Sequence, residues 1–155
     1  MKKCIVAGAV IFGKDYKVLL IKHKKLGVWL YPGGHLEENE NPIQCAIREA
    51  KEETGIDIKI LDIRKEAQKF EYAQILPMPI AILLENVNYK EGAHEHFDLV
   101  YASEAESDSI SLNEKETEGI RWFTEDEIDS LKTYQNVKYV LKQAFNAYKQ
   151  FKIRQ

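Results

Sequence analysis

The chain has 155 residues, of which 45% are hydrophobic and 30% charged, and its formal net charge is −3. This length suits one domain with one core over residues 1–155, and the acidic balance argues against a strong electrostatic hold on a nucleic-acid backbone. Two cysteines, Cys4 and Cys45, form no CxxC pair and no zinc-finger spacing. Two thiols in a chain of this size fit a reducing compartment, so we expect a cytoplasmic protein.

The first predicted elements are two short strands at residues 4–12 and 17–23, which flank the turn Gly13-Lys14-Asp15 as a hairpin. Two lysines before the first apolar run superficially resemble a signal peptide. A second apolar strand begins at Val18 with no small-residue cleavage site between them, so a buried first strand is favoured. No apolar run reaches the 18 residues of a membrane span, and we expect no membrane partner.

A helix is predicted over residues 42–54 because both of its ends are specified. Asn41 is a favourable N-cap before Pro42, and Gln44 completes a capping box. Gly55 suits the left-handed conformation that ends a helix. The apolar residues of this helix share one face, which we expect to meet a core: Ile43, Ala46, Ile47 and Ala50.

The remaining segments add strands and two further helices. The predicted strands lie at 56–74, 78–86, 96–103 and 120–123, the first of them long or broken. A short helix over 125–131 would follow Thr124 as its N-cap. A longer helix at 134–150 carries one apolar stripe, which we expect to dock on a sheet rather than on a membrane surface. Strands mixed with helices predict an α/β fold, in which a mixed sheet is sandwiched between helices.

Three carboxylates gather on one side of the helix at 42–54. Glu49, Glu52 and Glu53 stand at i, i+3 and i+4, where like charges repel by roughly 0.2–0.5 kcal/mol per pair. They also lie in the half of the helix whose dipole disfavours negative charge. A solvated helix face tolerates such costs. A hard divalent cation would instead turn the repulsion into ligation, and an all-oxygen ligand set suits Mg²⁺, with Mn²⁺ as a substitute.

The stretch from Gly34 to Ile56, GHLEENENPIQCAIREAKEETGI, resembles the Nudix box, Gx5Ex7REUxEExGU with U aliphatic, at every position. Ala50 is a small choice for one U position. Weaker similarity to the family flanks the box at Trp29 to Gly33 and at residues 121–128. The resemblance implies a Nudix fold and a Nudix pyrophosphohydrolase. Such an enzyme hydrolyses a diphosphate linkage in a nucleoside diphosphate joined to a group X, by attack of water at phosphorus.

The resemblance also assigns metal-binding roles within the box. The implied ligands are Glu49, Glu52, Glu53 and a backbone carbonyl near Gly33–Gly34. Arg48 would orient the acidic cluster by pairing with Glu40, because its planar fork suits a bidentate carboxylate contact. Gly34, Glu40 and Gly55 would serve as structural positions of the motif.

A general base is implied among the same acidic residues. Glu53, next to Glu52 in the catalytic cluster, or Glu116 in a loop far along the chain would take a proton from the attacking water. Glu114 and Glu118 are rivals of Glu116, and the whole acidic run could equally be a solvated loop.

The residues expected to meet the substrate lie outside the helix. His35 follows the Gly-Gly turn, and Tyr31 precedes it. His94 and His96 alternate on a strand, so both rings share one face. This pair has three interpretations. It could contact substrate phosphate, it could form a transition-metal site without an evident third ligand, or it could be an exposed pair at a strand end. Aromatic residues considered for stacking a base are Trp29, Tyr31, Phe70, Tyr72 and Tyr101, although core packing is common for strand aromatics.

Two other functions stay open on the sequence. A Nudix fold can sense a nucleotide without cutting it, but the complete set of box glutamates and Arg48 favours an enzyme. An RNA-end pyrophosphohydrolase shares the chemistry but needs a basic surface, which this composition does not provide. The expected partner is therefore a small nucleotide-type molecule, with nucleic acid disfavoured and a homodimer expected from the resemblance alone.

Overall fold

The computed structural model describes residues 1–89 and 92–155, and its centre is a mixed β-sheet. The strand order is β10-β2-β1-β9-β5, with β3 beside β2, β4 beside β1 and β8 beside β9. β1 and β9 run parallel, whereas β2 and β4 pair with β1 in the antiparallel sense. The strands are β1 Lys2–Phe12, β2 Val18–His23, β3 Trp29–Leu30, β4 Gly33–His35, β5 Ile58–Ile60, β8 Ala81–Tyr89, β9 Gly92–Ala105 and β10 Thr117–Phe123.

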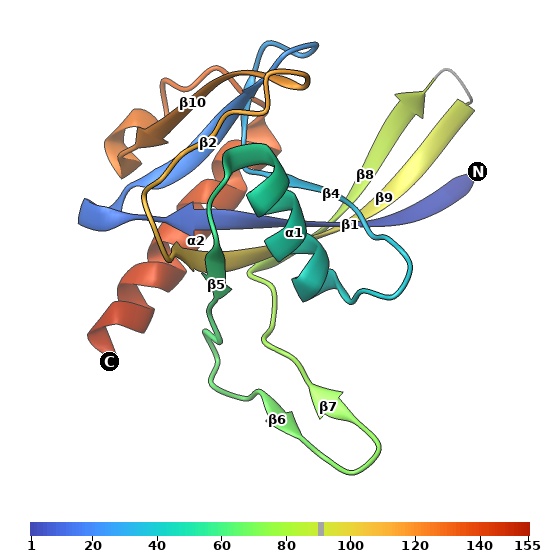
Figure 1. The fold of residues 1–155 in the computed structure, drawn as a ribbon, viewed down its shortest axis with the longest axis vertical. Coiled ribbons are helices and arrows are strands. Elements are labelled where there is room, and N and C mark those ends of the chain that lie inside the picture. The colour runs from blue at the N-terminus through green and yellow to red at the C-terminus, as the bar shows by residue number, and fades with distance from the viewer. Residues whose placement is uncertain (90–91) are drawn as a thin grey trace.

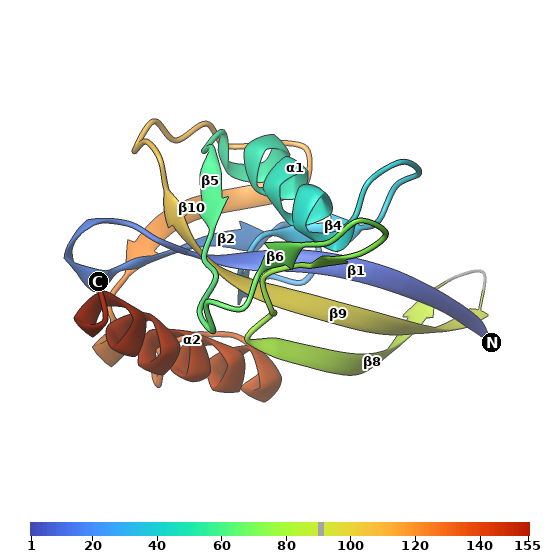
Figure 2. The ribbon, with the colours of Figure 1, turned by 90° about the horizontal axis from the view of Figure 1, so that it is seen from below.

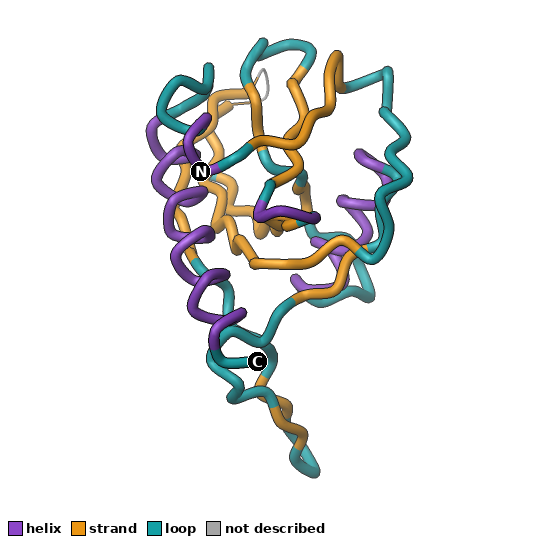
Figure 3. The backbone as a smooth tube through the Cα atoms, turned by 90° about the vertical axis from the view of Figure 1, so that its left-hand side faces the viewer, coloured by secondary structure: helices purple, strands orange, loops and turns teal. Residues whose placement is uncertain are grey.

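Two helices cover opposite faces of this sheet. α1 spans Pro42–Thr54 and α2 spans Gln135–Ile153. Figures 1 and 2 show α1 on one face and α2 along the other, and Figure 3 shows the two helices on either side of the strands. The predicted sandwich of a mixed sheet between helices is therefore confirmed. Within the described residues, no helix combines the length and apolar character that crossing a membrane requires.

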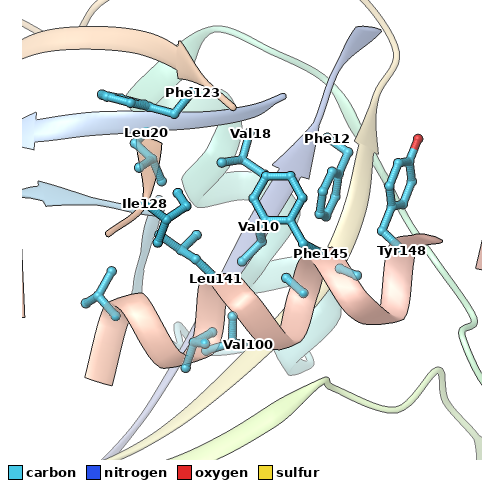
Figure 4. Close-up of a cluster of buried hydrophobic side chains, with 14 of the residues drawn as sticks. Val10, Phe12, Val18, Leu20, Val100, Phe123, Ile128, Leu141, Phe145 and Tyr148 are labelled. Carbon is cyan, nitrogen blue, oxygen red and sulfur yellow. The ribbon is translucent and has the colours of Figure 1, made fainter. Parts of the chain in front are cut away.

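Alternation along β1 divides the core into two layers. Val10 and Phe12 face α2, and Ala9 and Ile11 face α1. On the α2 side the Phe12 ring stacks on Tyr148, with ring centroids 4.0 Å apart (Figure 4). Burying each large apolar side chain stabilises the fold by roughly 1.5–3 kcal/mol, so the stripe on α2 fixes this helix to the sheet as predicted.

Helix α1 begins and ends at the predicted residues. The Asn41 side chain accepts the Gln44 amide at 2.9 Å, and the Gln44 side chain accepts the Asn41 amide at 2.8 Å. Gly55 adopts a left-handed conformation with φ of 76° and donates its amide to the Lys51 carbonyl. The predicted apolar face packs on the sheet, with Ala46 and Ala50 fully buried and Ile43 and Ile47 partly so. Cys45 is an additional buried member of that face.

One predicted element is corrected, and the segment at 56–74, expected as a long or broken strand, is found to be broken. The helix expected at 125–131 is only a 3-10 turn at Glu125–Glu127, followed by a further tight turn in which the Leu131 amide donates to the Ile128 carbonyl. A segment this short cannot propagate an α-helix, and burial of Ile128 and Leu131 holds the turns instead.

The strand expected over 56–74 is broken into three pieces. β5 ends at Ile60, and a turn closed from the Lys65 amide to the Asp62 carbonyl redirects the chain. β6 Gln68–Lys69 and β7 Gln74–Ile75 then form a separate two-stranded hairpin, which projects away from the sheet (Figure 3). The strands β3 and β4, each two or three residues long, were not predicted.

We expect the αL position of Gly55 to be costly to fill. A Cβ there would lie 2.8 Å from Ser111 Cβ, in addition to the strain of a positive φ. Gly27 has a similar φ of 65°, but a Cβ there would meet only the end of the Lys132 side chain, at an ordinary contact distance of 3.9 Å. Gly27→Ala should therefore lower the free energy of unfolding by about 1 kcal/mol, and Gly55→Ala by at least about 1 kcal/mol more. Urea denaturation of both variants measures the difference, and equal losses would contradict the role of the Ser111 contact.

Candidate active site

A cleft of about 980 Å³ opens where the acidic edge of α1, the strand β4 and the strands β8 and β9 meet. Its wall brings together most of the residues singled out in the sequence: Tyr31, Gly33, Gly34, His35, Glu49, Glu52, Glu53, His96 and Glu116. A second cavity of about 800 Å³ lies near the far end of β1, around Tyr148 and Trp122, and contains none of these residues. The chemistry of the side chains therefore singles out the first cleft.

The two glycines of β4 let carboxylates from α1 come against the strand. A Cβ on Gly34 would fall 2.4 Å from Glu49 Oε1. The Gly33 amide donates to Glu53 Oε1 at 3.1 Å. β4 is held in turn by pairing with β1, where Gly34 lies opposite Ala7. A side chain at Gly34 would push Glu49 away from the strand, whereas one at Gly33 would meet the β1 backbone at Ala7 and Gly8, 2.9 Å away. The Gly-Gly pair therefore lets β4 lie close both to β1 and to the acidic edge of α1.

Glu53 is an unusually buried carboxyl for a helix surface, with only 7% of its area exposed. Burial first, and then its hydrogen bond and charge interaction with Glu49, raise the pKa of Glu53 to about 9. Repulsion from Glu116 adds to this shift, so the far loop reaches the same cluster. Crowded, partly desolvated carboxylate oxygens of this kind match the ligands of a hard divalent cation, which would relieve their repulsion.

Arg48 lies outside the cleft wall and connects the acidic residues around it by hydrogen bonds. Its Nε and one terminal nitrogen donate to Glu40 at 3.0 and 2.8 Å, in the bidentate geometry expected from the sequence. The other terminal nitrogen donates to Glu49 and Glu52 at 3.0 and 3.2 Å. These contacts hold the pKa of Glu40 down at about 2, chiefly through its hydrogen bonds with Arg48. One guanidinium thus connects the loop before α1 with two of the cleft carboxylates.

The three rival glutamates, Glu114, Glu116 and Glu118, have different surroundings. Glu116 lines the cleft. Glu118 instead forms an ion pair with Lys22, with 3.6 Å between Nζ and Oε1. Lys24 donates to the Glu114 carbonyl at 2.8 Å, so the backbone of that residue is tied to the strand-end loop. Of the three, Glu116 is the one that the geometry brings to Glu53.

Two acidic residues on the inner wall of the cleft were not among the site residues predicted from the sequence. Asp98 on β9 and Glu85 on β8 line the cleft, and the Tyr31 hydroxyl donates to Asp98 at 3.3 Å. Burial, the charge of Glu85 and a hydrogen bond with it raise the pKa of Asp98 to about 7. Burial also raises the pKa of Glu85. The available signal was an acidic residue two residues before the buried Val100, which places both side chains on the same inward face of the strand.

The histidines are divided between the cleft and its rim. His35 and His96 line the cleft, and their ring centroids are 4.9 Å apart. Burial first, and then the neighbouring His35 and His94, lower the pKa of His96. His94 lies two residues away on the same face of β9 but outside the wall of the cleft. The placement of His96 in the cleft wall fits a contact with substrate. His94 lies outside that wall, so its placement does not support the same role.

Most of the aromatic residues considered for stacking lie elsewhere. Tyr101 is buried in the core layer under α1, and the Trp29 ring packs edge-on against Phe123. Phe70 and Tyr72 belong to the projecting hairpin and are exposed. Only Tyr31 of this group reaches the cleft. The other four were wrong as stacking candidates for this cleft, because strand alternation and the turn after β5 place them outside it.

Comparison with known proteins agrees with this geometry. The family model described as NUDIX domain matches residues 2–145. The chain is 32% identical over 108 residues to the "Probable DHNTP pyrophosphohydrolase" of Lactococcus lactis subsp. cremoris, covering 70% of this chain and 58% of that protein. It is 43% identical over 61 residues to the "8-oxo-dGTP diphosphatase" of Proteus vulgaris, covering 37% of this chain and 54% of that protein. The chain thus spans little more than half of the length of these curated relatives.

A solved structure extends the similarity to the whole fold. A hydrolase of the NUDIX family from Clostridium perfringens superposes with a TM-score of 0.76 and 27% identity, covering 94% of this chain and 98% of that chain. The resemblance first seen at residues 34–56 therefore holds over most of the chain.

The raised pKa of Glu53 predicts a pH-dependent stability in the absence of divalent cations. The native state holds this proton more tightly than the unfolded state, whose value is near 4.5, so the free energy of unfolding should fall as pH rises toward 9. Asp98 adds to the fall only up to about pH 7. Between pH 7 and 9 one such group contributes at most about 1.4 kcal/mol per pH unit.

Glu53→Gln should flatten this fall between pH 7 and 9. Urea denaturation in a chelator at several pH values measures both proteins, with Glu38→Gln as the control, since that residue has the same chemistry in an exposed position outside the cleft wall. Parallel slopes for the parent and Glu53→Gln would rule out a strongly shifted Glu53.

Proposed function

The chain belongs to the NUDIX family, and on this premise we propose that it is a magnesium-dependent hydrolase that cuts a diphosphate linkage in a nucleotide-type substrate. The observation that carries the proposal is the crowding of Glu49 and Glu53 against the Gly33–Gly34 strand. Such buried like charges are costly unless a cation joins them. A cleft of about 980 Å³ in front of them has room for a nucleotide.

We assign the cation to the carboxylates of Glu49, Glu52 and Glu53, helped by a backbone carbonyl of the glycine pair. The Gly34 carbonyl already accepts the Cys45 thiol at 3.4 Å, which makes the Gly33 carbonyl the better candidate. When bound, Mg²⁺ supplies positive charge that neutralises diphosphate oxygens and stabilises charge building toward the leaving group. Mn²⁺ prefers the same oxygen ligands.

The residues of the chain divide the remaining tasks. Glu53 or Glu116 accepts the proton of the attacking water, since both carboxylates meet at the cleft and a neighbouring negative charge makes a carboxylate a stronger base. Arg48 is a positioning residue, because it fixes Glu49 and Glu52 through hydrogen bonds without lining the cleft itself. His35 and His96 lie where they can meet phosphate oxygens.

The other end of the cleft suggests how the rest of the substrate is held. Asp98, Glu85 and Tyr31 form a partly desolvated polar patch on the inner wall. Carboxyl oxygens there accept hydrogen bonds from N–H groups, and a proton kept on one of them at neutral pH can donate. We propose that this patch binds the edge of a base that carries N–H donors. Relatives named for 8-oxo-dGTP and CTP hydrolysis make purine and pyrimidine nucleotides sensible first substrates.

Glu53→Gln tests the chemistry. On a nucleotide that the parent hydrolyses with Mg²⁺, turnover should fall by about 100-fold or more, because an electrostatic contact or a general base is lost. Stability in chelator should stay equal or rise, because carboxylate repulsion is relieved. Phosphate or pyrophosphate release from a nucleotide panel measures turnover, and EDTA should abolish it. Glu38→Gln makes the same charge change outside the cleft wall and should retain parental turnover.

Other outcomes would refute the proposal or change one of its parts. Full turnover of the parent in EDTA would refute the role of a cation. Cation-dependent nucleotide binding without turnover across the panel would identify a sensor, and turnover confined to triphosphate-ended RNA would identify an RNA-end hydrolase. Near-parental turnover in Glu53→Gln would leave Glu116 as the base.

Asp98→Asn tests the base-recognition patch separately from the chemistry. Losing one hydrogen bond to a charged acceptor costs about 1.5–3 kcal/mol, which corresponds to a 10- to 100-fold fall in kcat/KM. The loss should appear mainly in KM, because this contact is made equally in the ground state and the transition state. Glu95→Gln, on the same strand but the opposite face, is the matched control. An unchanged KM for Asp98→Asn would exclude the patch as the base site while leaving the hydrolase intact.

A further inference from the structure

The start of β1 lies beside the first part of β9, at the end of the sheet marked N in Figures 1 and 2. Cys4 on β1 is the direct neighbour of His96 on β9 in the parallel register. His94 lies two residues before His96 and therefore points to the same face of the sheet. One ligand atom from each of these three residues lies within 4.8 Å of the other two.

This arrangement supplies the ligand that the spacing His94-x-His96 lacked. Cys4 is ninety residues away in the sequence, and only the β1–β9 register brings its thiol to the histidine pair. Four-coordinate zinc has ligand atoms about 3.3–3.8 Å apart, as Zn–N of about 2.0–2.1 Å and Zn–S of about 2.3 Å require. Cys4 and His94 are only half-buried, so their side chains have room to rotate and bring the ligand atoms closer to that spacing.

The geometry points to a second metal site, formed by Cys4, His94 and His96, that takes zinc or a similar thiophilic divalent transition metal. One thiolate and two imidazoles are soft and borderline donors, which Mg²⁺ does not favour. Three protein ligands leave a fourth position for water, for His35 beside His96, or for a substrate group. The site thus differs in donor chemistry from the carboxylate cluster on α1.

The surroundings of His96 support ligation. Glu85 Oε1 lies 4.0 Å from His96 Nδ1, which is longer than a hydrogen bond. A small shift would let this carboxylate accept the Nδ1 proton and orient the ring while its other nitrogen meets a metal. His96 also lines the cleft, so a metal here would sit at the rim of the proposed substrate site. Cys4 and His94 lie outside the cleft wall, which allows them to be altered without touching the carboxylates.

Cobalt binding tests the site without reference to activity. Metal-free protein in excess Mg²⁺, which occupies oxygen ligands, is titrated with Co²⁺ and followed by absorption. One equivalent should give a sulfur-to-cobalt charge-transfer band together with the visible bands of tetrahedral cobalt, and one equivalent of Zn²⁺ should remove both. Cys4→Ala should abolish the charge-transfer band and weaken Zn²⁺ binding by at least about 10- to 100-fold. His94→Gln should weaken it by a similar factor while keeping the band at high Co²⁺.

Matched controls identify the ligands. Cys45→Ala removes the other thiol of the chain and should keep the band. His23→Gln removes a histidine outside the cluster and should keep the Zn²⁺ affinity. The site is refuted if the parent shows no charge-transfer band, or if Cys4→Ala binds Zn²⁺ as tightly as the parent. It is equally refuted if Glu53→Gln lowers Zn²⁺ affinity as much as Cys4→Ala does, because the metal would then sit on the α1 carboxylates.

Discussion

The close approach of helix α1 to the Gly33–Gly34 strand is the constraint on which the rest of the site depends. It brings Glu49 and Glu53 against backbone with no intervening Cβ, and it removes Glu53 from most of its water. Two carboxyls held in this way repel each other, and the fold offsets the repulsion only in part, through Arg48 at Glu49 and the Gly33 amide at Glu53. On the cleft side the oxygens stay crowded, and from this crowding we infer that the cluster binds a cation. A helix that was merely acidic and solvated would need neither the glycines nor the arginine.

The mixed sheet extends this local arrangement into a binding site. Because β1 pairs with β4 on one side and with β9 on the other, the glycine strand and the polar part of β9 are held on one framework. The same alternation that sends Val100 into the core under α2 sends Asp98 and His96 toward the cleft nearer the open end of the sheet. Helix α2 covers only the apolar part of that face (Figures 2 and 4). The cleft thus lies over the part of this sheet face that carries polar side chains and is not covered by α2.

How much of the fold and the site could be predicted depends on how far apart in the sequence the interacting residues lie. Helix α1 was predicted to the residue because Asn41, Gln44 and Gly55 act within one turn of its ends, and the Arg48–Glu40 pair spans only eight residues. The helix expected at 125–131 was wrong because a good N-cap does not supply the length that a helix needs. Cys4 beside His96, and Glu85 beside Asp98, depend on strand register between distant segments. Sequence spacing carries no record of such register, so these neighbours appear only once the sheet is known.

Two cation chemistries can coexist in one small fold only if their ligands do not compete. Carboxylates and carbonyls on α1 and β4 favour a hard ion, and the thiol and imidazoles of β1 and β9 favour a softer one. His96 and Glu85 stand between the two groups, since both line the cleft and His96 also belongs to the sulfur-nitrogen cluster. A metal held by the cluster would fix the His96 ring and place positive charge at the rim of the cleft, where a polyphosphate would be attracted to it. The softer site would then act on substrate placement and leave the bond-breaking chemistry to the carboxylates, because it contributes no ligand to the α1 cluster.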